Sequence, residues 1–269
     1  MKYFNECDIS IQSNFGSGVI LAQNASINVN RNINSTYVLG RKNSSQVIKT
    51  KADEASVDFA YLVNINDPIF KAFDYIKTGV FTNSFPEFSI PLTLKLAGIS
   101  GLFYPSRFSL SLTPNSKVQA NASFSCFSNL SGSLLDKVSI NNLNSGSGIA
   151  HSWNARVSGN STNQNYNVLD FSYSLDVGWD PIYAVGKQRP AQVNLTNAQE
   201  TFDYTIDNFN SDFTNVNLST AENSTVYINT FGNQPIFNIN TSGSKIDSSS
   251  LSNNIDDFAK NKISLKRSF

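Results

Sequence analysis

Apolar and polar residues alternate with a period of two along much of this chain. The alternation is unbroken through Leu169, Phe171, Tyr173, Leu175 and Val177, as expected for a β-strand with one buried and one solvated face. The same pattern recurs in further segments, at residues 27–33, 57–63, 92–96, 108–112, 202–206 and 263–265. Because antiparallel sheets with one wet face produce this pattern, the sequence predicts a mainly β protein with antiparallel sheets.

A single short helix is predicted within this framework, from Asp67 to Lys77. Asp67 can cap the helix, Pro68 suits its first position and Gly79 suits its exit. One face of the helix would carry its large apolar residues, Ile69, Phe70, Phe73 and Ile76. We expect this face to be buried against a sheet or an open barrel end. The composition of residues 250–260 also permits a second, polar helix.

An internal repeat organises the chain. Residues 35–42 read STYVLGRK and residues 181–188 read PIYAVGKQ, so that Tyr37 and Gly40 align with Tyr183 and Gly186. Each segment follows an alternating strand that ends in a polar turn. We expect both glycines to lie in turns that a β-branched side chain cannot enter.

The correspondence continues downstream of this motif. Gln46 and Val47 match Gln192 and Val193, Glu54 matches Glu200, and VDFAY at 57–61 resembles FDYTI at 202–206. The ends of the two copies, residues 107–127 and 248–269, also share a strand or Ser-rich turn, a short polar stretch and a closing alternating strand.

The repeat predicts two tandem antiparallel β units. The first covers residues 1–128, with the short helix in it, and the second covers residues 150–269. The connector, residues 129–149, is rich in Gly, Ser and Asn. The alternative is chance similarity between two β segments written in a reduced alphabet, against which the matched order and spacing of several elements count.

The segment DVGWDPIYAVGKQRPAQVNLTNAQETFDYTIDNF resembles the first half of tail-tube subunits from long-tailed bacteriophages, and NINSTYVLGRKNSSQVIKTKADEASVDFAYLV lies in the matching place of the first unit. The first copy lacks counterparts of Trp179 and Pro181, and the second lacks a clear copy of the helix. The resemblance implies β-sandwich or partial-barrel domains with a flanking helix, whose sheets join neighbouring subunits around a ring. The rings stack into a tube through which DNA passes.

This resemblance also implies the partners and the location. The chain would form a trimer with pseudo-sixfold symmetry or a hexamer, contact other tail proteins, and meet DNA only as non-specific cargo in the lumen. It would be made in the host bacterial cytoplasm and reside in the virion tail. Two alternatives remain. One is a baseplate hub or distal-tail ring protein of the same virion, and the other is a carbohydrate- or surface-binding β-sandwich with an aromatic platform that includes Trp153 or Trp179.

The composition argues against several other partners. The 20 basic and 20 acidic residues give no net charge, and their scatter leaves no footprint for nucleic-acid recognition. We expect no export signal in MKYFNECDIS and no membrane anchor, because no segment approaches the roughly 20 apolar residues that cross a bilayer. Cys7 and Cys126 have no metal-ligand spacing and are expected to be buried thiols.

The residues that carry catalysis are few. His151 is the single histidine and is interpreted as a surface or interface residue. The carboxylate pairs Asp53 with Glu54 and Asp256 with Asp257 are interpreted as solvated turns, because their spacing matches no calcium loop. We therefore expect a protein that is not an enzyme, with no catalytic residues, no cofactor and no metal.

Overall fold

The computed structural model describes residues 9–13, 16–20, 22–37, 39, 46–49, 51–65, 67–81, 92–96, 99–128, 130–132, 148–159, 168–207, 223–252 and 260–269. Within these ranges the chain is mainly β, with antiparallel pairing and one α-helix, as the alternation predicts. The elements of the first half are β1 (Ile9–Ser13), β2 (Gly16–Ile20), β3 (Ala22–Asn30), β4 (Ile33–Thr36), β5 (Gln46–Lys49), β6 (Glu54–Leu62), α1 (Pro68–Phe81), β7 (Leu92–Leu96), β8 (Ile99–Leu112), β9 (Gln119–Cys126) and β10 (Ser131–Gly132). The second half contains the 3₁₀ helix η2 (Ser152–Asn154), β11 (Arg156–Gly159), β12 (Val168–Tyr183), β13 (Pro190–Asp207), β14 (Ser224–Asn229), β15 (Pro235–Asn240), β16 (Lys245–Ser252) and β17 (Lys260–Ser268).

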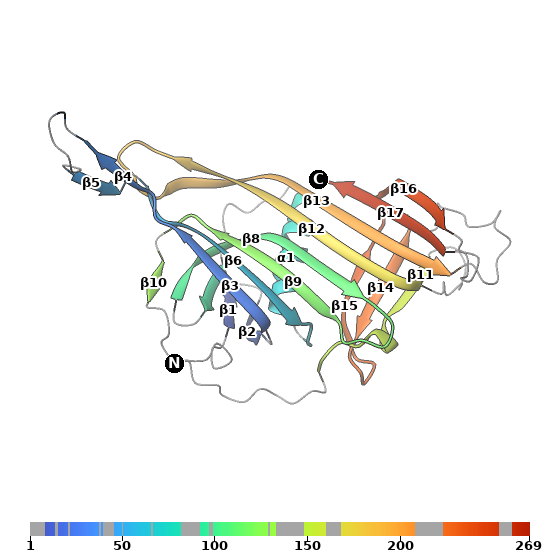
Figure 1. Cartoon of the computed structure of the whole chain (residues 1–269). Coiled ribbons are helices and arrows are strands. Elements are labelled where there is room, and N and C mark those ends of the chain that lie inside the picture. The colour runs from blue at the N-terminus through green and yellow to red at the C-terminus, as the bar shows by residue number, and fades with distance from the viewer. Residues whose placement is uncertain are drawn as a thin grey trace.

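One large antiparallel sheet runs through both halves of the chain (Figure 1). Its strand order is β3-β6-β9-β8-β12-β13-β17-β16, so that β8 pairs with β9 on one side and with β12 on the other. The side chains of each strand alternate between an apolar face and a face of mostly small polar residues. The sheet is open, with β3 and β16 at its two ends.

Strand β8 bends and takes part in two sheets. Its first residues pair with β7, which leads on to β1 and β2, and its later residues enter the large sheet. The partner changes between Phe103 and Tyr104, and a bulge between Pro105 and Arg107 follows directly, as expected where a strand turns sharply. A separate three-stranded sheet has the order β11-β14-β15, and β4 pairs with β5 in a projecting hairpin.

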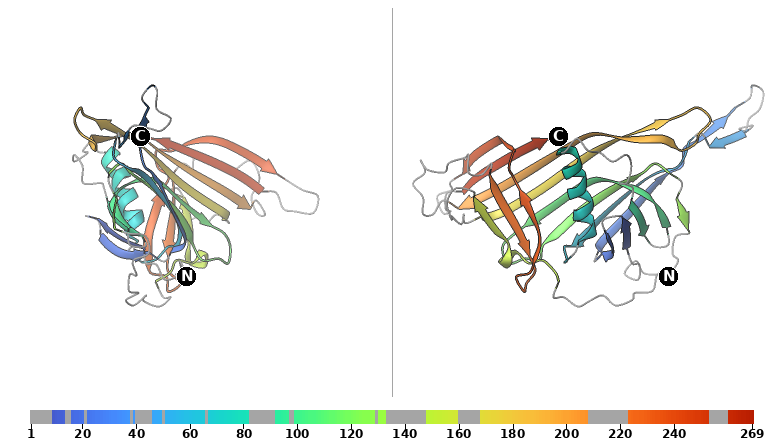
Figure 2. Two further views of the ribbon diagram at one scale, coloured as in Figure 1. Left: turned by 60° about the vertical axis from the view of Figure 1, so that its left-hand side comes forward. Right: turned by 180° about the vertical axis from the view of Figure 1, so that it is seen from behind.

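The helix α1 packs on the apolar face of the large sheet (Figure 2). Phe73 lies 5.5 Å from Phe108, centroid to centroid, and Phe70 stacks on Phe237 of β15 at 3.7 Å. Asp67 caps the helix, as predicted, because its Oδ1 accepts hydrogen bonds from the backbone amides of Ile69 and Phe70. The helix continues past the predicted end at Lys77 and past Gly79 to Phe81.

The structure also bears on the predicted polar helix and on the predicted connector. The polar helix over residues 250–260 is wrong at both ends, because Ser250–Ser252 belong to β16 and Lys260 begins β17. Residues of the predicted connector contact the first half: β10 pairs with β8, and the Ile65 amide donates to the Gly148 carbonyl at 2.8 Å.

Candidate assembly interface at the open edges of the sheet

The strand order of the large sheet repeats itself. In chain order the first four strands are β3, β6, β8 and β9, and the second four are β12, β13, β16 and β17. In space they lie as β3-β6-β9-β8 and then β12-β13-β17-β16. Each set therefore places its first, second, fourth and third strands side by side in the same order.

The register of the first strand pair also repeats. Ile27 pairs with Val57, and Tyr173, which is aligned with Ile27 by the spacing of the Tyr-x-x-Gly motifs, pairs with Phe202. A bulge follows Ala22 in β3, and an equivalent bulge follows Val168 in β12. The matching bulges show that the two pairs share the same backbone pattern, because a bulge fixes the register on both sides of it.

The remaining pairs match in the same way. Strand β8 has its bulge between Pro105 and Arg107, and β16 has one at the equivalent place, between Ile246 and Ser248. From these bulges to Ser111 and Ser252, β8 pairs with β9 in the same register as β16 pairs with β17. The smaller sheets agree as well, since β1-β7-β8 and β11-β14-β15 have equivalent antiparallel order.

The tyrosines of the two Tyr-x-x-Gly segments lie at the ends of two projecting hairpins. Tyr37 follows β4 and is exposed, while Tyr183 is the last residue of β12. Gly186 has φ +80° in the turn that follows, whereas Gly40 lies outside the described residues. The β4–β5 pairing and the end of the β12–β13 pairing share one register under the same alignment, up to Thr36 and Ile182, the residues just before the two tyrosines.

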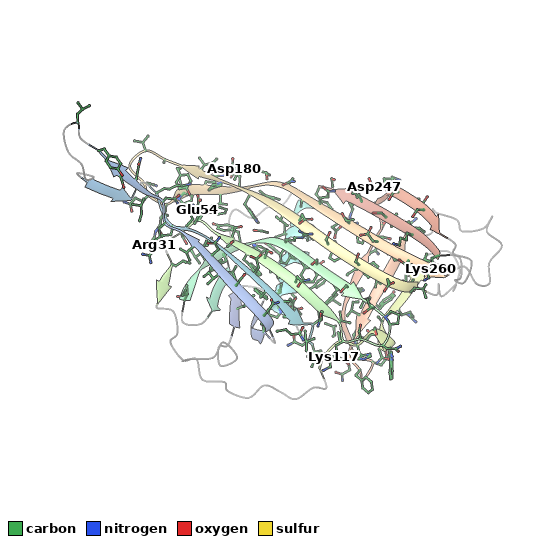
Figure 3. All side chains as sticks on the ribbon, in the orientation of Figure 1. Arg31, Glu54, Lys117, Asp180, Asp247 and Lys260 are labelled. Atoms are coloured by element: carbon green, nitrogen blue, oxygen red, sulfur yellow. The ribbon has the colours of Figure 1, made fainter. Side chains whose placement is uncertain are left out.

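The two hairpins point the same way (Figure 1), and the segment that follows β5 contacts the turn between β12 and β13. The Ala52 amide donates to the Gln188 carbonyl at 2.7 Å, and Lys51 Nζ lies 5.6 Å from the ring centre of Tyr183. Asp180 and Lys117, labelled in Figure 3, mark the hairpin end of the sheet and the opposite end. Each hairpin therefore extends the large sheet at one end of its strands.

The predicted alignment of Glu54 with Glu200 is wrong by one residue. Glu200 lies opposite Leu175, and the residue that lies opposite the equivalent Val29 is Ala55 rather than Glu54. Glu54 is on the other face, where it forms an ion pair with Lys51 at 2.5 Å. A one-residue difference between the hairpin and β6 explains the mismatch, because side chains of successive strand residues point to opposite faces.

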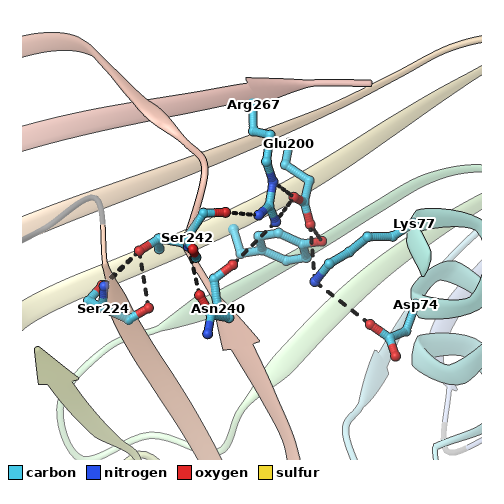
Figure 4. A network of polar contacts seen from close by, with 9 residues as sticks. Asp74, Lys77, Glu200, Ser224, Asn240, Ser242 and Arg267 are labelled. Carbon is cyan, nitrogen blue, oxygen red and sulfur yellow. Dashed lines mark hydrogen bonds and ion pairs between the residues drawn. The ribbon is translucent and has the colours of Figure 1, made fainter. Parts of the chain in front are cut away.

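Glu200 belongs to a buried polar network that was not predicted from the sequence (Figure 4). Its carboxylate accepts hydrogen bonds from the Arg267 guanidinium and, at 2.6 Å, from the Tyr173 hydroxyl. Lys77 of α1 lies 3.6 Å from the same carboxylate. Burial and the neighbouring carboxylate raise the pKa of Tyr173 well above its usual value. Alternation is the sequence signal that could have found it, since Glu200 shares a strand face with the apolar residues Phe202 and Tyr204.

Other candidate residues fall in separate places. Trp179 is partly buried, and its indole N–H donates to the Pro105 carbonyl at 2.7 Å, so it offers no open platform. Trp153 and Phe231 are both exposed and lie beside His151, whose Nδ1 accepts from the Trp153 amide at 3.2 Å. This aromatic group lies at the strand ends opposite the hairpins, next to the β8–β9 turn.

The structure describes only some of the cysteines and acidic residues for which no metal-binding role was predicted. Cys126 is a buried free thiol, while Cys7, Asp256 and Asp257 lie outside the described residues. No cluster of three or more potential metal ligands occurs in the described part of the chain. Across those same ranges, no helix combines the length and the apolar character needed to span a membrane.

The junction between the two sets of strands is closed, whereas the outer edges are open. Strand β12 pairs with β8 at the junction, and its Leu175 is 1% exposed. In the described chain, β3 pairs only with β6 and β16 only with β17. Val29, the equivalent of Leu175 on β3, is 37% exposed. An edge strand with an uncovered apolar side chain is a candidate site for pairing with another chain.

No protein-family model matches this chain, and no curated protein sequence matches it.

Proposed function

We propose that this protein is a virion structural protein, the subunit of a bacteriophage tail tube that assembles with copies of itself into stacked rings around a DNA-conducting channel. Residues 1–128 and 150–269 would be two tail-tube-like units joined by residues 129–149. Three chains would supply six units with pseudo-sixfold symmetry, and a hexamer of whole chains is the other arrangement. The observation that carries the proposal is the repeated strand order and register in one sheet with two open edges.

The open edges support assembly with copies of the same chain. Unpaired strand edges promote aggregation, and proteins that keep them usually cover them. In this chain the inner strand β12 is covered by β8 and the equivalent outer strand β3 is not. Joining copies edge to edge would remove this liability, because each copy brings one edge of each kind.

The two ends of the strands support stacking of rings. Exposed apolar side chains lie near the tips of both hairpins, at Tyr37, Leu39 and Val185. Trp153 and Phe231 are exposed at the opposite end. Stacked rings would bring the hairpin tips of one ring to the aromatic group of the next and bury both.

The polar face of the sheet is suited to passage of DNA without binding. It carries Ser, Asn and Thr on most strands, and its charged residues have both signs: the acidic Glu54, Asp58, Asp170, Asp176, Asp203 and Asp247, and the basic Arg107, Lys245, Lys260, Lys262 and Lys266. A face with no excess positive charge lacks the attraction to phosphate that would hold the cargo.

Negative-stain imaging of the purified protein tests the proposal. We expect hollow rings or tubes of uniform bore, and a protein that stays monomeric at high concentration would overturn it. Val29→Lys adds a charge at a side chain that is exposed in the single chain and would be buried on edge pairing, so this variant should stay monomeric. Leu102→Lys, at a similarly exposed residue away from both open edges, is the matched control and should assemble normally.

The alternatives predict different images and ligands. A baseplate hub or distal-tail ring would give single rings that do not extend into tubes. A carbohydrate-binding β-sandwich would use the exposed pair Trp153 and Phe231. In that case the protein should remain a monomer, and sugars should shift a tryptophan fluorescence signal that Trp153→Ala removes.

A further inference from the structure

The junction inside the chain provides a template for the junction between copies. At this junction β8, the third strand of its set, lies antiparallel to β12, the first strand of the next set. Ser109 lies opposite Ser174, and Ser111 lies opposite Ser172. The third strand of the second set is β16 and the first strand of the first set is β3, and these are the two open edges.

We propose that β16 of one copy pairs with β3 of the next copy in the register that β8 and β12 use within the chain. This inference rests on the proposed assembly into rings. The matched bulges fix the register, because they make Ser250 the equivalent of Ser109 and Asn28 the equivalent of Ser174. Ser250 then lies opposite Asn28, with Ser248 opposite Asn30 and Ser252 opposite Ser26.

The side chains at these positions fit such a pairing. On the polar face the register brings together serines and asparagines, which are small, uncharged and able to hydrogen-bond across strands. On the apolar face it places Ser249 opposite Val29. Val29 would gain a neighbouring strand as Leu175 does in β8, with Ser249 in the place that Phe108 takes opposite Leu175. No like charges oppose each other in this register.

The pairing is heterologous, because two different edges meet. Each copy offers one β16 edge and one β3 edge, so every added copy leaves both kinds of edge for the next copy until a ring closes. A twofold pairing of β3 with β3, or of β16 with β16, would stop at a dimer for each edge. These twofold arrangements make a different prediction for cross-linking.

Cysteine cross-linking tests the register. Ser250→Cys combined with Asn28→Cys should form disulfide-linked multimers under mild oxidation, seen on a non-reducing gel, because directly opposed strand residues have Cβ atoms close enough for a disulfide. The controls combine Ser250→Cys with Ser26→Cys or with Asn30→Cys, which move one thiol two residues out of register on the same face. We expect cross-linking at least tenfold slower in both controls. All four positions are exposed, so the core is unchanged.

Three further outcomes are informative. The two single variants should each remain uncross-linked alone and should form a disulfide dimer when mixed, whereas a dimer of Asn28→Cys alone would overturn the heterologous pairing. The unsubstituted chain reports any background from Cys7 and Cys126. Hollow rings in the images together with faster cross-linking in a shifted control would overturn the register and leave the proposed function standing. Monomers in the images would overturn the proposed function itself.

Discussion

The two sets of strands hold different chemistry at one equivalent buried place. Between β6 and β9 the opposed residues are Ala55 and Cys126, both small and buried. At the same place between β13 and β17 the opposed residues are Glu200 and Arg267, a buried ion pair. The backbone pairing is therefore the same in both sets, while the side chains it places in the core range from apolar to charged. The register of this fold is set by the strands and bulges rather than by a fixed core composition.

The Glu200–Arg267 pair connects elements of the fold that the Ala55–Cys126 pair does not connect. Besides Glu200, the Arg267 guanidinium donates to the backbone carbonyls of Asn240 and Ser242 at the end of β15 and just after it. Lys77 joins the network from α1, which precedes the whole second set in the chain. Burial of two charges carries a desolvation cost that only full hydrogen bonding offsets. The network thus ties the helix and the three-stranded sheet to the second set of strands.

Removing one partner of the ion pair should produce the largest difference in stability between the two equivalent positions. Arg267→Ala leaves the fully buried Glu200 carboxylate without its guanidinium, and we expect a loss of about 3–5 kcal/mol in the free energy of unfolding. The matched control is Cys126→Ala at the equivalent place, where the loss should be roughly 1 kcal/mol. Urea denaturation at a dilution where the protein is monomeric would measure both. Equal losses would mean that the two places are energetically alike.

Replacing both partners should be far milder than removing one. Glu200→Leu with Arg267→Met converts the charged place to an apolar one of similar volume, and we expect a loss of about 1–2 kcal/mol, because neither charge is stranded and the main cost is the buried Tyr173 hydroxyl left without its acceptor. Lys77 retains Asp74, which lies 3.7 Å away. The double-mutant cycle with the two single variants gives the coupling between them. Additive losses would show that the pair acts as two independent residues.

A pH series tests Asp67, which is buried like Glu200 but is bonded to a tyrosine hydroxyl and backbone amides instead of a guanidinium. Burial raises the pKa of Asp67 to about 6, although the Tyr61 hydroxyl and two backbone amides donate to it. The folded protein therefore holds a proton that the unfolded chain releases near about pH 4. Relative to Asp67→Asn, the wild-type free energy of unfolding should fall by roughly 1–3 kcal/mol between pH 4 and pH 7. A rise over the same range would contradict the assignment.

Much of the sheet could be predicted from residue patterns. The alternation at Leu169–Val177 identified β12, and the Asp67–Pro68 pair located the start of α1. The shared motif around Tyr37 and Tyr183 aligned two hairpins that do share a register. These features depend on local sequence, so that period, caps and turns were sufficient to find them.

Other features depended on tertiary pairing. Residues Ser250–Ser252 were part of the predicted polar helix, yet they belong to β16 and pair with β17. This tertiary pairing overrides local preference. Identity alone aligned Glu54 with Glu200, whereas the sheet equates Glu200 with Ala55. The strand order β6-β9-β8 requires knowledge of which strands meet, which no local pattern contains.

The smallest expected effect concerns the ion pair at the inner junction. Arg107 and Asp176 lie 3.3 Å apart there, with both side chains more than half exposed. We expect Arg107→Ser to lower the free energy of unfolding by less than about 1 kcal/mol, because exposed pairs are weakened by solvent and salt. Urea denaturation at low and at high salt would measure this loss, and a loss that high salt leaves unchanged would contradict an ionic origin.

The outer junction offers the matching gain. Ser248 and Asn30 are the outer-edge equivalents of Arg107 and Asp176, so the outer junction lacks this pair. Installing it with Ser248→Arg and Asn30→Asp should strengthen assembly slightly at low salt and lose that gain at high salt. Exchanging the two charges between the edges, with Ser248→Asp and Asn30→Arg, should give the same gain if these residues face each other. A gain in only one orientation would show that the neighbouring charges Lys245 and Glu54, rather than a direct pair, set the preference.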